Sequence, residues 1–291
     1  MDALRQILSR LPEPISAEIG SLPDEITRQA EEIRLRCGRQ VIISFRNKEK
    51  LLSTAVTKDD LQRTLNNLIK FSYHAYEDDL ARGFVTIAGG HRVGICGKVI
   101  CKKDRPVLIR EISSMNIRFA REITGCSNHL LPLILQDGRP VNTLIVSPPG
   151  CGKTTLLRDM TRALSLRGIK VAVCDERSEI AGMYDSVPSF DLGPRTDVLD
   201  GCDKTRGIAM LIRSMSPQVI VTDEMGRQED IDAVYMCGNA GVSLITSIHG
   251  NDENDVLRSG IGSLVQKKVF KNVIYLSSER GPGTVKEIKS A

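Results

Sequence analysis

The sequence predicts an α/β protein whose C-terminal half holds a mainly parallel sheet, preceded by a smaller α+β domain. Two observations predict this fold class. In the C-terminal half, short β-rich runs alternate with helical segments, as in parallel strands joined by crossover helices; the runs are 142–146, 171–174, 219–222 and 244–248. In the N-terminal half, alternating strand patterns surround one amphipathic helix without that regular alternation.

The composition is that of a globular chain with room for two cores. At 291 residues the chain is long enough for two domains, and its 41% hydrophobic and 26% charged residues exclude a disordered protein. The net charge is only 40 − 36 = +4, and the aromatic residues are 6 Phe and 5 Tyr without Trp. Both features argue against a nucleic-acid-binding surface, so we expect no nucleic acid among the partners.

The cysteine pattern and the first residues predict a location. The eight cysteines are spaced singly without a CxxC pair, and the chain starts without the charged and apolar segments of a secretory signal. No apolar run approaches the roughly 20 residues that cross a bilayer. We therefore expect reduced thiols and a cytoplasmic protein that reaches a membrane only through partners.

Residues 1–120 are expected to form the α+β domain. Alternating residues over Glu32–Phe45 predict a β-hairpin that turns at Gly38, and apolar residues spaced i, i+4, i+7 and i+8 predict a helix over 59–69. Further strands are expected at 84–87, 92–95 and 116–119.

Residues 121–140 are predicted to connect this domain to the next. Ser127 or Asn128 can cap a short helix through Gln136, and the run DGRP that follows has the composition of a turn. The second domain is therefore predicted to span 141–291.

A phosphate-binding loop is the strongest motif. The run SPPGCGKTT lies between a β-rich run and a helical run, where backbone N–H groups at a helix N-terminus can bind phosphate oxygens. In this pattern a lysine reaches the β- and γ-phosphates and a hydroxyl binds Mg²⁺, with Thr154 as that metal ligand here. Ser147 stands where the pattern has its first glycine, which removes no ligand. The residues predicted to bind ATP are Ser147, Pro148, Pro149, Gly150, Cys151, Gly152, Lys153, Thr154 and Thr155.

Two adjacent acids follow the β-rich run 219–222. A carboxylate at the end of a buried strand can hold a metal through water, and the next carboxylate can orient or deprotonate the attacking water. We therefore predict Asp223 as the Mg²⁺ ligand and Glu224 as the catalytic base.

Two further strand ends carry polar side chains. Asp175 or Glu176 is expected near the metal or the nucleophilic water, although charged strand ends are common on the rims of sheets. His249 ends the run 244–248, where it can sense the γ-phosphate, although a lone histidine is usually packed or solvated. Glu176 and His249 are therefore added to the predicted catalytic residues.

Four runs, in this order, resemble the traffic ATPases of bacterial secretion and type IV pilus systems over roughly residues 90–260. SPPGCGKTTLLR is similar to their Walker A motif, VCDERSEI to their Asp box, RSMSPQVIVTDEMGR to their arginine-led Walker B strand and LITSIHG to their His box. The resemblance implies a RecA-like P-loop NTPase domain and an ATP hydrolase that uses Mg²⁺. It also implies a homo-oligomer, a hexameric motor whose site is completed by a neighbouring subunit.

The runs EEIRLRCGRQ and GGHRVGICGKV are similar to a sporulation branch of that family. This resemblance implies integral membrane proteins of a sporulation channel or secretion-like complex as partners, and a peripheral, mother-cell position at the inner membrane. In the family, N-domain arginines can approach the γ-phosphate. Arg92 and Arg118 occupy similar positions, although exposed strand arginines are usually solvated. The tetracysteine zinc motif of some secretion ATPases is missing, so we expect no zinc.

Two other interpretations stay open. A nucleic-acid-stimulated RecA-like ATPase or helicase would share the loop, the Walker B strand and a polar sensor, and ATPase assays with and without DNA would distinguish it. A nucleotide-gated scaffold without turnover would not need a base at Glu224. No Asn-Lys-x-Asp run occurs, which favours ATP over GTP.

Overall fold

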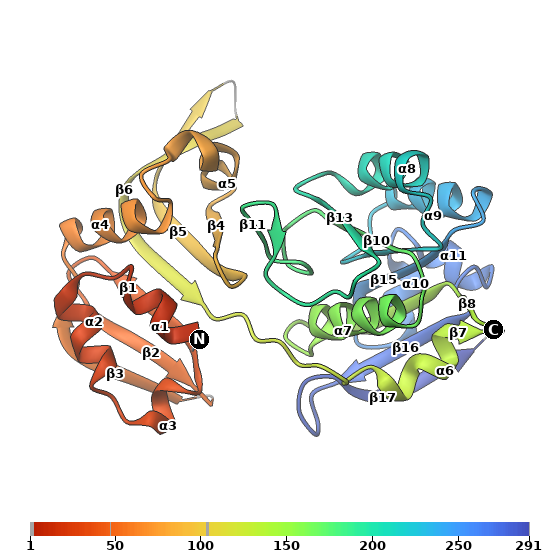
Figure 1. The fold of residues 1–291 in the computed structure, drawn as a ribbon, viewed down its shortest axis with the longest axis horizontal. Helices are drawn as coiled ribbons and strands as arrows, with labels where there is room; N and C mark the ends of the chain where they lie inside the picture. Colours follow the sequence, from red (N-terminus) through yellow and green to blue (C-terminus); the bar gives the residue numbers. More distant parts are fainter. Residues whose placement is uncertain (1–2, 47, 103–104, 291) are drawn as a thin grey trace. The chain divides into compact units, whose positions relative to one another are not determined.

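The computed structural model describes residues 3–46, 48–102 and 105–290. Contacts divide these residues into two compact units, each built around its own sheet (Figure 1). The first unit runs to Arg121 and includes the later segment Gly182–Ser189, whereas the rest of the described chain forms the second unit. The connector expected at 121–140 stays a prediction, and its residues from Glu122 onward belong to the second unit.

The first unit contains a six-stranded antiparallel sheet in the order β3-β2-β1-β6-β5-β4. Its strands are β1 (Ala30–Arg36), β2 (Gln40–Phe45), β3 (Lys48–Ala55), β4 (Phe84–Ile87), β5 (His91–Lys102) and β6 (Arg105–Arg118). Its helices are α1 (Ala3–Leu8), α2 (Glu13–Gly20), α3 (Asp24–Thr27), α4 (Lys58–Leu68), η1 (Tyr73–Tyr76) and α5 (Glu77–Ala81). A small hairpin of β11 (Met183–Tyr184) and β12 (Val187–Pro188) belongs to the same unit, and the Lys70 ammonium lies 5.1 Å from the ring centre of Tyr184.

The predicted hairpin and helix of this unit are both confirmed. Alternate residues of β1, such as Ile33 and Leu35, are buried, and the chain turns into β2 at Gly38 with φ of 71°. Helix α4 begins with a capping box in which Thr57 and Asp60 bond each other's backbone N–H groups. The leucines that recur along α4 are buried in the same core as the inward-facing strand residues.

The second unit contains a seven-stranded sheet in the order β13-β10-β14-β15-β9-β16-β17, parallel except for the edge strand β17. Its sheet strands are β9 (Thr143–Ser147), β10 (Val171–Asp175), β13 (Thr196–Asp200), β14 (Val219–Thr222), β15 (Ser243–His249), β16 (Asn272–Ser277) and β17 (Thr284–Ser290). The remaining elements are η2 (Asn128–Leu130), α6 (Leu131–Ile134), β7 (Leu135–Gln136), β8 (Arg139–Pro140), α7 (Lys153–Leu166), α8 (Lys204–Met215), α9 (Asp230–Asn239), α10 (Glu253–Arg258) and α11 (Gly262–Gln266). The predicted mainly parallel α/β architecture is confirmed.

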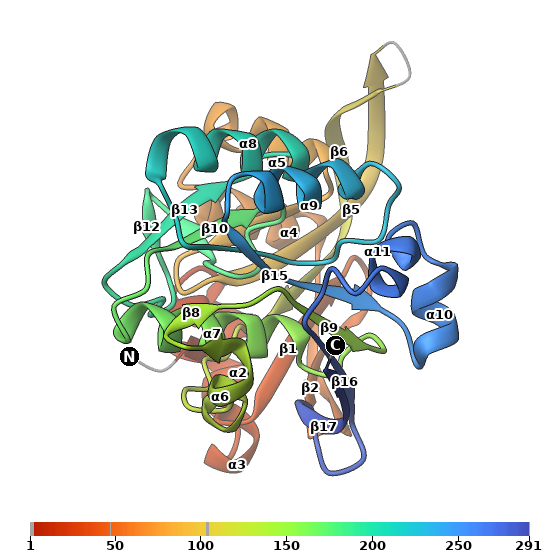
Figure 2. The same ribbon diagram turned by 90° about the vertical axis from the view of Figure 1, so that its right-hand side faces the viewer.

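Helices cover both faces of this sheet, which explains why its central strands are apolar along their whole length. Every residue of β9, β10 and β14 is buried. The crossovers from β9 to β10 and from β14 to β15 run in opposite directions across the sheet, so α7 lies on one face and α8 with α9 on the other (Figure 2). Among the described residues, no helix is long and apolar enough to span a membrane.

The helix predicted through Gln136 ends two residues earlier. Leu135 and Gln136 form β7, which pairs with β8 across a two-residue turn. Asp137 and Gly138 in that turn have φ of 50° and 73°, the left-handed geometry of a tight hairpin. The last two residues of the expected helix, Leu135 and Gln136, are therefore part of the hairpin instead.

Glu18 joins α2 to β3. Its carboxylate accepts hydrogen bonds from the backbone N–H and the hydroxyl of Ser53, at 2.6 and 2.7 Å, and from those of Thr54, at 2.9 and 2.5 Å. The hydrogen bonds from the Thr54 and Ser53 side chains are the main reason that the pKa of Glu18 falls from 4.5 to about 2.

We predict that Glu18→Gln loosens the contact between α2 and β3 at neutral pH, because a neutral amide replaces a charged acceptor. Since the folded pKa lies below the unfolded value, the stabilisation is complete above pH 4.5 and is lost as the pH falls toward about 2. Hydrogen exchange of the Ser53 and Thr54 amides is therefore expected to be faster in the variant at neutral pH and equal to wild type near the lower limit. Equal exchange at neutral pH would contradict the prediction.

Candidate functional site

The predicted phosphate-binding loop joins the end of β9 to the start of α7. Gly150 and Gly152 have φ of 76° and 85°, in the left-handed region that favours glycine. A Cβ on Gly152 would also lie 3.1 Å from the amide nitrogen of Gly283, which donates a hydrogen bond to the Cys151 carbonyl at 2.8 Å. The loop therefore depends on glycine at position 152 for both its backbone angle and its close packing.

The other predicted residues of the loop take ordinary positions around it. Thr154 and Thr155 lie half-buried in the first turn of α7, Cys151 is buried, and Pro149 is exposed. Hydroxyls in the first helical turn lie beside the N–H groups that a helix N-terminus leaves without partners. These N–H groups can bind an anion, and the hydroxyls can bind a cation that accompanies it.

The ammonium of Lys153 is folded onto its own loop. Lys153 is 9% exposed, and Nζ donates to the carbonyl oxygens of Ser147 and Pro148 at 3.1 and 3.2 Å. Nζ also lies 2.9 Å from Nδ1 of His249. Burial lowers the pKa of Lys153, and the charge of Glu224 acts in the opposite direction.

Strand register brings the predicted residues to one edge of the sheet. His249 at the end of β15 is opposite Ser147 at the end of β9, and Cys174 of β10 is opposite Thr222 of β14. The polar residues that follow these positions therefore emerge at the carboxyl edge beside the loop, where parallel sheets bind ligands.

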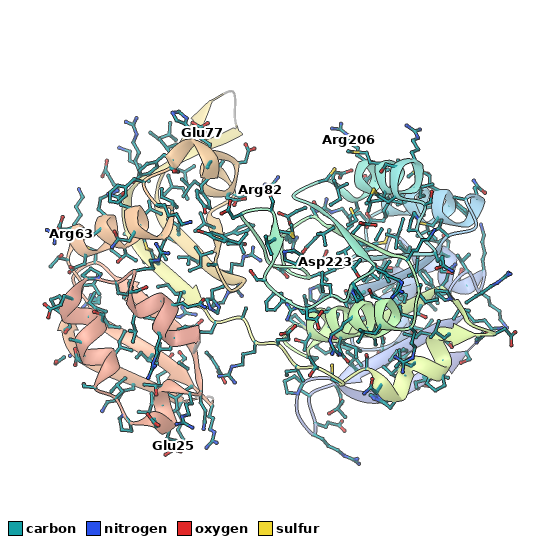
Figure 3. All side chains as sticks on the ribbon, in the orientation of Figure 1. Glu25, Arg63, Glu77, Arg82, Arg206 and Asp223 are labelled. Carbon is teal, nitrogen blue, oxygen red and sulfur yellow. The ribbon has the colours of Figure 1, made fainter. Side chains whose placement is uncertain are left out.

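Asp223 follows β14 and is 3% exposed; Figure 3 labels it inside the second unit. Desolvation raises the pKa of this carboxyl group to about 6. Within the described chain Oδ1 has no hydrogen-bond partner, and Nζ of Lys204 lies 3.9 Å away. A buried carboxylate oxygen without a partner is unfavourable, and it is a hard ligand of the type that Mg²⁺ prefers. The residues present therefore fit the predicted metal.

Glu224 lies between the side chains of Arg177 and His249. Its Oε2 accepts a hydrogen bond from Arg177 at 2.7 Å, and its Oε1 lies 3.4 Å from Nε2 of His249. Its backbone has φ of 41°, which is strained for a residue with a side chain, and its N–H donates to Ser247 Oγ at 3.1 Å. The carboxylate is thereby oriented beside the histidine that also contacts Lys153.

The structure separates the roles of Asp175 and Glu176, which the sequence left open. Asp175 is fully buried, and its carboxylate accepts hydrogen bonds from the backbone N–H groups of residues 179–181 at distances between 2.8 and 3.0 Å. Burial nevertheless raises the pKa of Asp175 to about 7. Asp175 shapes the loop that follows it, whereas Glu176 forms an ion pair with Lys204.

Sequence reasoning gave no role to Arg177 or Lys204. Arg177 stands inside the run VCDERSEI, so the motif contained a signal for it. Lys204 contacts Glu176 across 28 residues of sequence, and no motif includes it. Both residues supply positive charge to the predicted catalytic acids.

Arg92 and Arg118 lie in the first unit. They are directly opposite each other on β5 and β6, and Arg118 is also opposite Glu32 of β1. The guanidinium of Arg92 stacks 3.7 Å from the ring centre of Phe84. Because directly opposite residues of neighbouring strands point to the same face, Arg92, Arg118 and Glu32 lie on one face of the sheet.

Two solved structures share the fold. The pilus retraction motor PilT, in a structure with bound ADP, matches with a TM-score of 0.60 at 15% identity, over 90% of this chain and 76% of that one. The Legionella pneumophila ATPase DotB matches with a TM-score of 0.55 at 14% identity, over 85% and 72% of the two chains. At such low identity these matches bear on the fold alone, and they confirm the predicted RecA-like P-loop architecture.

The sequence comparisons identify the family. The family model described as "Sporulation stage III, protein AA" matches residues 12–291. Stage III sporulation protein AA of Bacillus subtilis (strain 168) is 41% identical over 291 residues, which cover 98% of this chain and 94% of that protein. These matches extend over nearly the whole sequence and confirm the sporulation branch that the N-terminal runs predicted. The chain therefore belongs to the sporulation stage III protein AA family.

Proposed function

We propose that the chain is an Mg²⁺-dependent ATP hydrolase of the secretion-ATPase type. The observation that carries the proposal is the continuous contact from the phosphate loop to an acid. Lys153 Nζ lies 2.9 Å from His249, and His249 lies 3.4 Å from Glu224. The ADP in the PilT structure further supports a nucleotide as the ligand of this fold.

The loop residues 147–155 bind the phosphates of ATP in this proposal. Backbone N–H groups of the loop donate to phosphate oxygens, and Lys153 exchanges the Ser147 and Pro148 carbonyls for the β- and γ-phosphates. That exchange is favourable because a charged phosphate is a stronger acceptor than a carbonyl. His249, which contacts the same ammonium, senses the terminal phosphate.

The metal is assigned to Thr154 and Asp223. A hydroxyl and a carboxylate oxygen are the ligands that Mg²⁺ prefers, and Asp223 Oδ1 lacks another partner within the described chain. When bound, the ion neutralises charge on the phosphate oxygens. Glu224 then orients the attacking water and accepts its proton, with Arg177 and His249 holding the carboxylate in place. Glu176 is the next candidate for the base.

The protein is proposed to work as a homo-oligomer, a hexamer by resemblance to the secretion ATPases. Its proposed partners are integral membrane proteins of a sporulation channel or secretion-like complex, at the mother-cell side of the inner membrane. Membership in a family named after a sporulation stage supports this assignment.

Arg92 and Arg118 complete the site by acting on the γ-phosphate.

Lys153→Ala is expected to abolish ATP hydrolysis and most nucleotide affinity, because Lys153 is the loop's cation for the β- and γ-phosphates. Turnover and binding of a fluorescent ATP analogue measure the effect. Lys267→Ala removes an exposed lysine after α11 and is the control for loss of charge. Wild-type turnover in Lys153→Ala would refute the assignment of the site.

Glu224→Gln is expected to separate binding from hydrolysis. The variant keeps Asp223 and the loop, so it should bind ATP, while hydrolysis falls by about 10²-fold or more for the loss of a general base. Single-turnover hydrolysis and equilibrium ATP binding distinguish the two steps. Normal hydrolysis would show that another carboxylate is the base, and Glu176→Gln would be tested next.

Arg92→Ala and Arg118→Ala are expected to reduce hydrolysis by about 10³-fold or more if they stabilise charge in the transition state, with little loss of ATP binding. Arg36→Ala on β1 of the same sheet is the matched control. If a neighbouring subunit completes the site, specific activity of the full chain should also rise with protein concentration by mass action. Flat activity from a demonstrated hexamer to a demonstrated monomer, with both variants unaffected, would reject the composite site.

A further inference from the structure

A buried lysine lies among the acids on the metal side of the site. Lys204, the first residue of α8, is only 7% exposed. Its Nζ forms an ion pair with Oε2 of Glu176 and lies 3.9 Å from Oδ1 of Asp223. The two acids follow the neighbouring parallel strands β10 and β14, so one ammonium connects two strand ends.

The position of this lysine is unfavourable by itself. The N-terminus of a helix carries partial positive charge, which repels a cation in the first turn. Burial removes the ammonium from water and adds a further cost. The attraction of Glu176 and Asp223 must offset both the repulsion by the helix N-terminus and the cost of desolvation. The two acids therefore stabilise the ammonium in this buried position.

The same acids require a cation when no metal is bound. Asp223 is nearly inaccessible to water and its Oδ1 accepts no hydrogen bond within the described chain. Lys153 does not serve here, because its ammonium is bound to the carbonyls of Ser147 and Pro148. Among the described residues, Lys204 is the cation with an ion-pair contact to this carboxylate, at 3.9 Å, and the charge of Arg177 acts on the same carboxylate.

We infer that Lys204 is a positioning residue that compensates Asp223 and Glu176 before Mg²⁺ arrives, and thereby makes metal binding depend on nucleotide. The inference rests on the proposed ATPase site and deepens it. Without nucleotide, a divalent cation at Asp223 is repelled by the nearby, poorly solvated ammonium of Lys204. With nucleotide, the phosphate charges compensate both cations, so the metal enters together with its substrate.

The test measures Mn²⁺ binding to the nucleotide-free, full-length protein by electron paramagnetic resonance. Lys204→Met removes the ammonium and keeps the length of the side chain, whereas Lys204→Arg keeps the charge. Lys289→Met is the matched control, because Lys289 on β17 also forms an ion pair, with Glu253 at 2.7 Å, outside the site.

Lys204→Met is expected to bind Mn²⁺ about tenfold tighter than wild type or more, because a charge that repels the ion is gone. Lys204→Arg and Lys289→Met should stay close to wild type. Saturating ADP should reduce the difference between Lys204→Met and wild type, since the phosphates already compensate the ammonium. If the Lys204 ammonium has no effect at the metal position, its removal should give no gain in Mn²⁺ affinity.

Thermal unfolding supplies a second readout. Without divalent ions Lys204→Met should melt below Lys289→Met, and Mg²⁺ should raise its melting temperature more than that of wild type. If Lys204→Met does not fold, the double variant Lys204→Met with Glu176→Gln removes both charges of the ion pair and keeps the net charge. Its Mn²⁺ affinity is then compared with that of Glu176→Gln alone, so that the two proteins again differ only by the ammonium.

Unchanged Mn²⁺ affinity in the folded variant would overturn the inference and leave Lys204 as a structural ion pair. The measurement contains no ATP, so it is independent of the proposed hydrolysis. Tighter Mn²⁺ binding in Lys204→Met, together with a wild-type protein that does not hydrolyse ATP, would support the role of Lys204 and reject only the proposed enzyme.

Discussion

The register of the parallel sheet in the second unit is the constraint on which the whole site depends. Because β9 pairs with β15 so that Ser147 is opposite His249, the phosphate loop and the histidine must emerge side by side. A slip of one residue would turn every side chain of a strand to the other face. The strands are buried on both faces by α7 on one side and α8 with α9 on the other, so such a slip would also disrupt the core.

Charge balance is the second constraint, because four acids lie at the ends of two neighbouring strands of this sheet and two of them, Asp175 and Asp223, are buried. Asp175 is compensated by backbone N–H groups of its own loop, Glu224 by Arg177, and Glu176 by Lys204. Each acid thus has a different type of partner, which fixes each carboxylate in a separate orientation. Among these four, Asp223 alone has a buried oxygen that accepts no hydrogen bond from the described residues, which distinguishes it as the position for an exchangeable cation.

Sequence could predict those parts of the protein whose determinants are local. The loop around Gly152 and the acids after β14 were recognisable because glycine, lysine and carboxylate stand at fixed spacing next to a strand or a helix. The contacts that organise these residues were not predictable, since Arg177 meets Glu224 across 47 residues and Lys153 meets His249 across 96. At Gln136 the helical pattern was misleading, because a left-handed turn two residues long determined the structure instead.

The segment Gly182–Ser189 gives the chain an unusual order of assembly. It follows directly on the loop that Asp175 shapes, yet its contacts, including that of Tyr184 with Lys70, belong to the unit formed by the N-terminal residues. During synthesis the N-terminal unit therefore stays incomplete until Ser189 has left the ribosome, by which time the residues of β9 and β10 have already been synthesised. The two units cannot mature strictly one after the other, as independent domains on a nascent chain do.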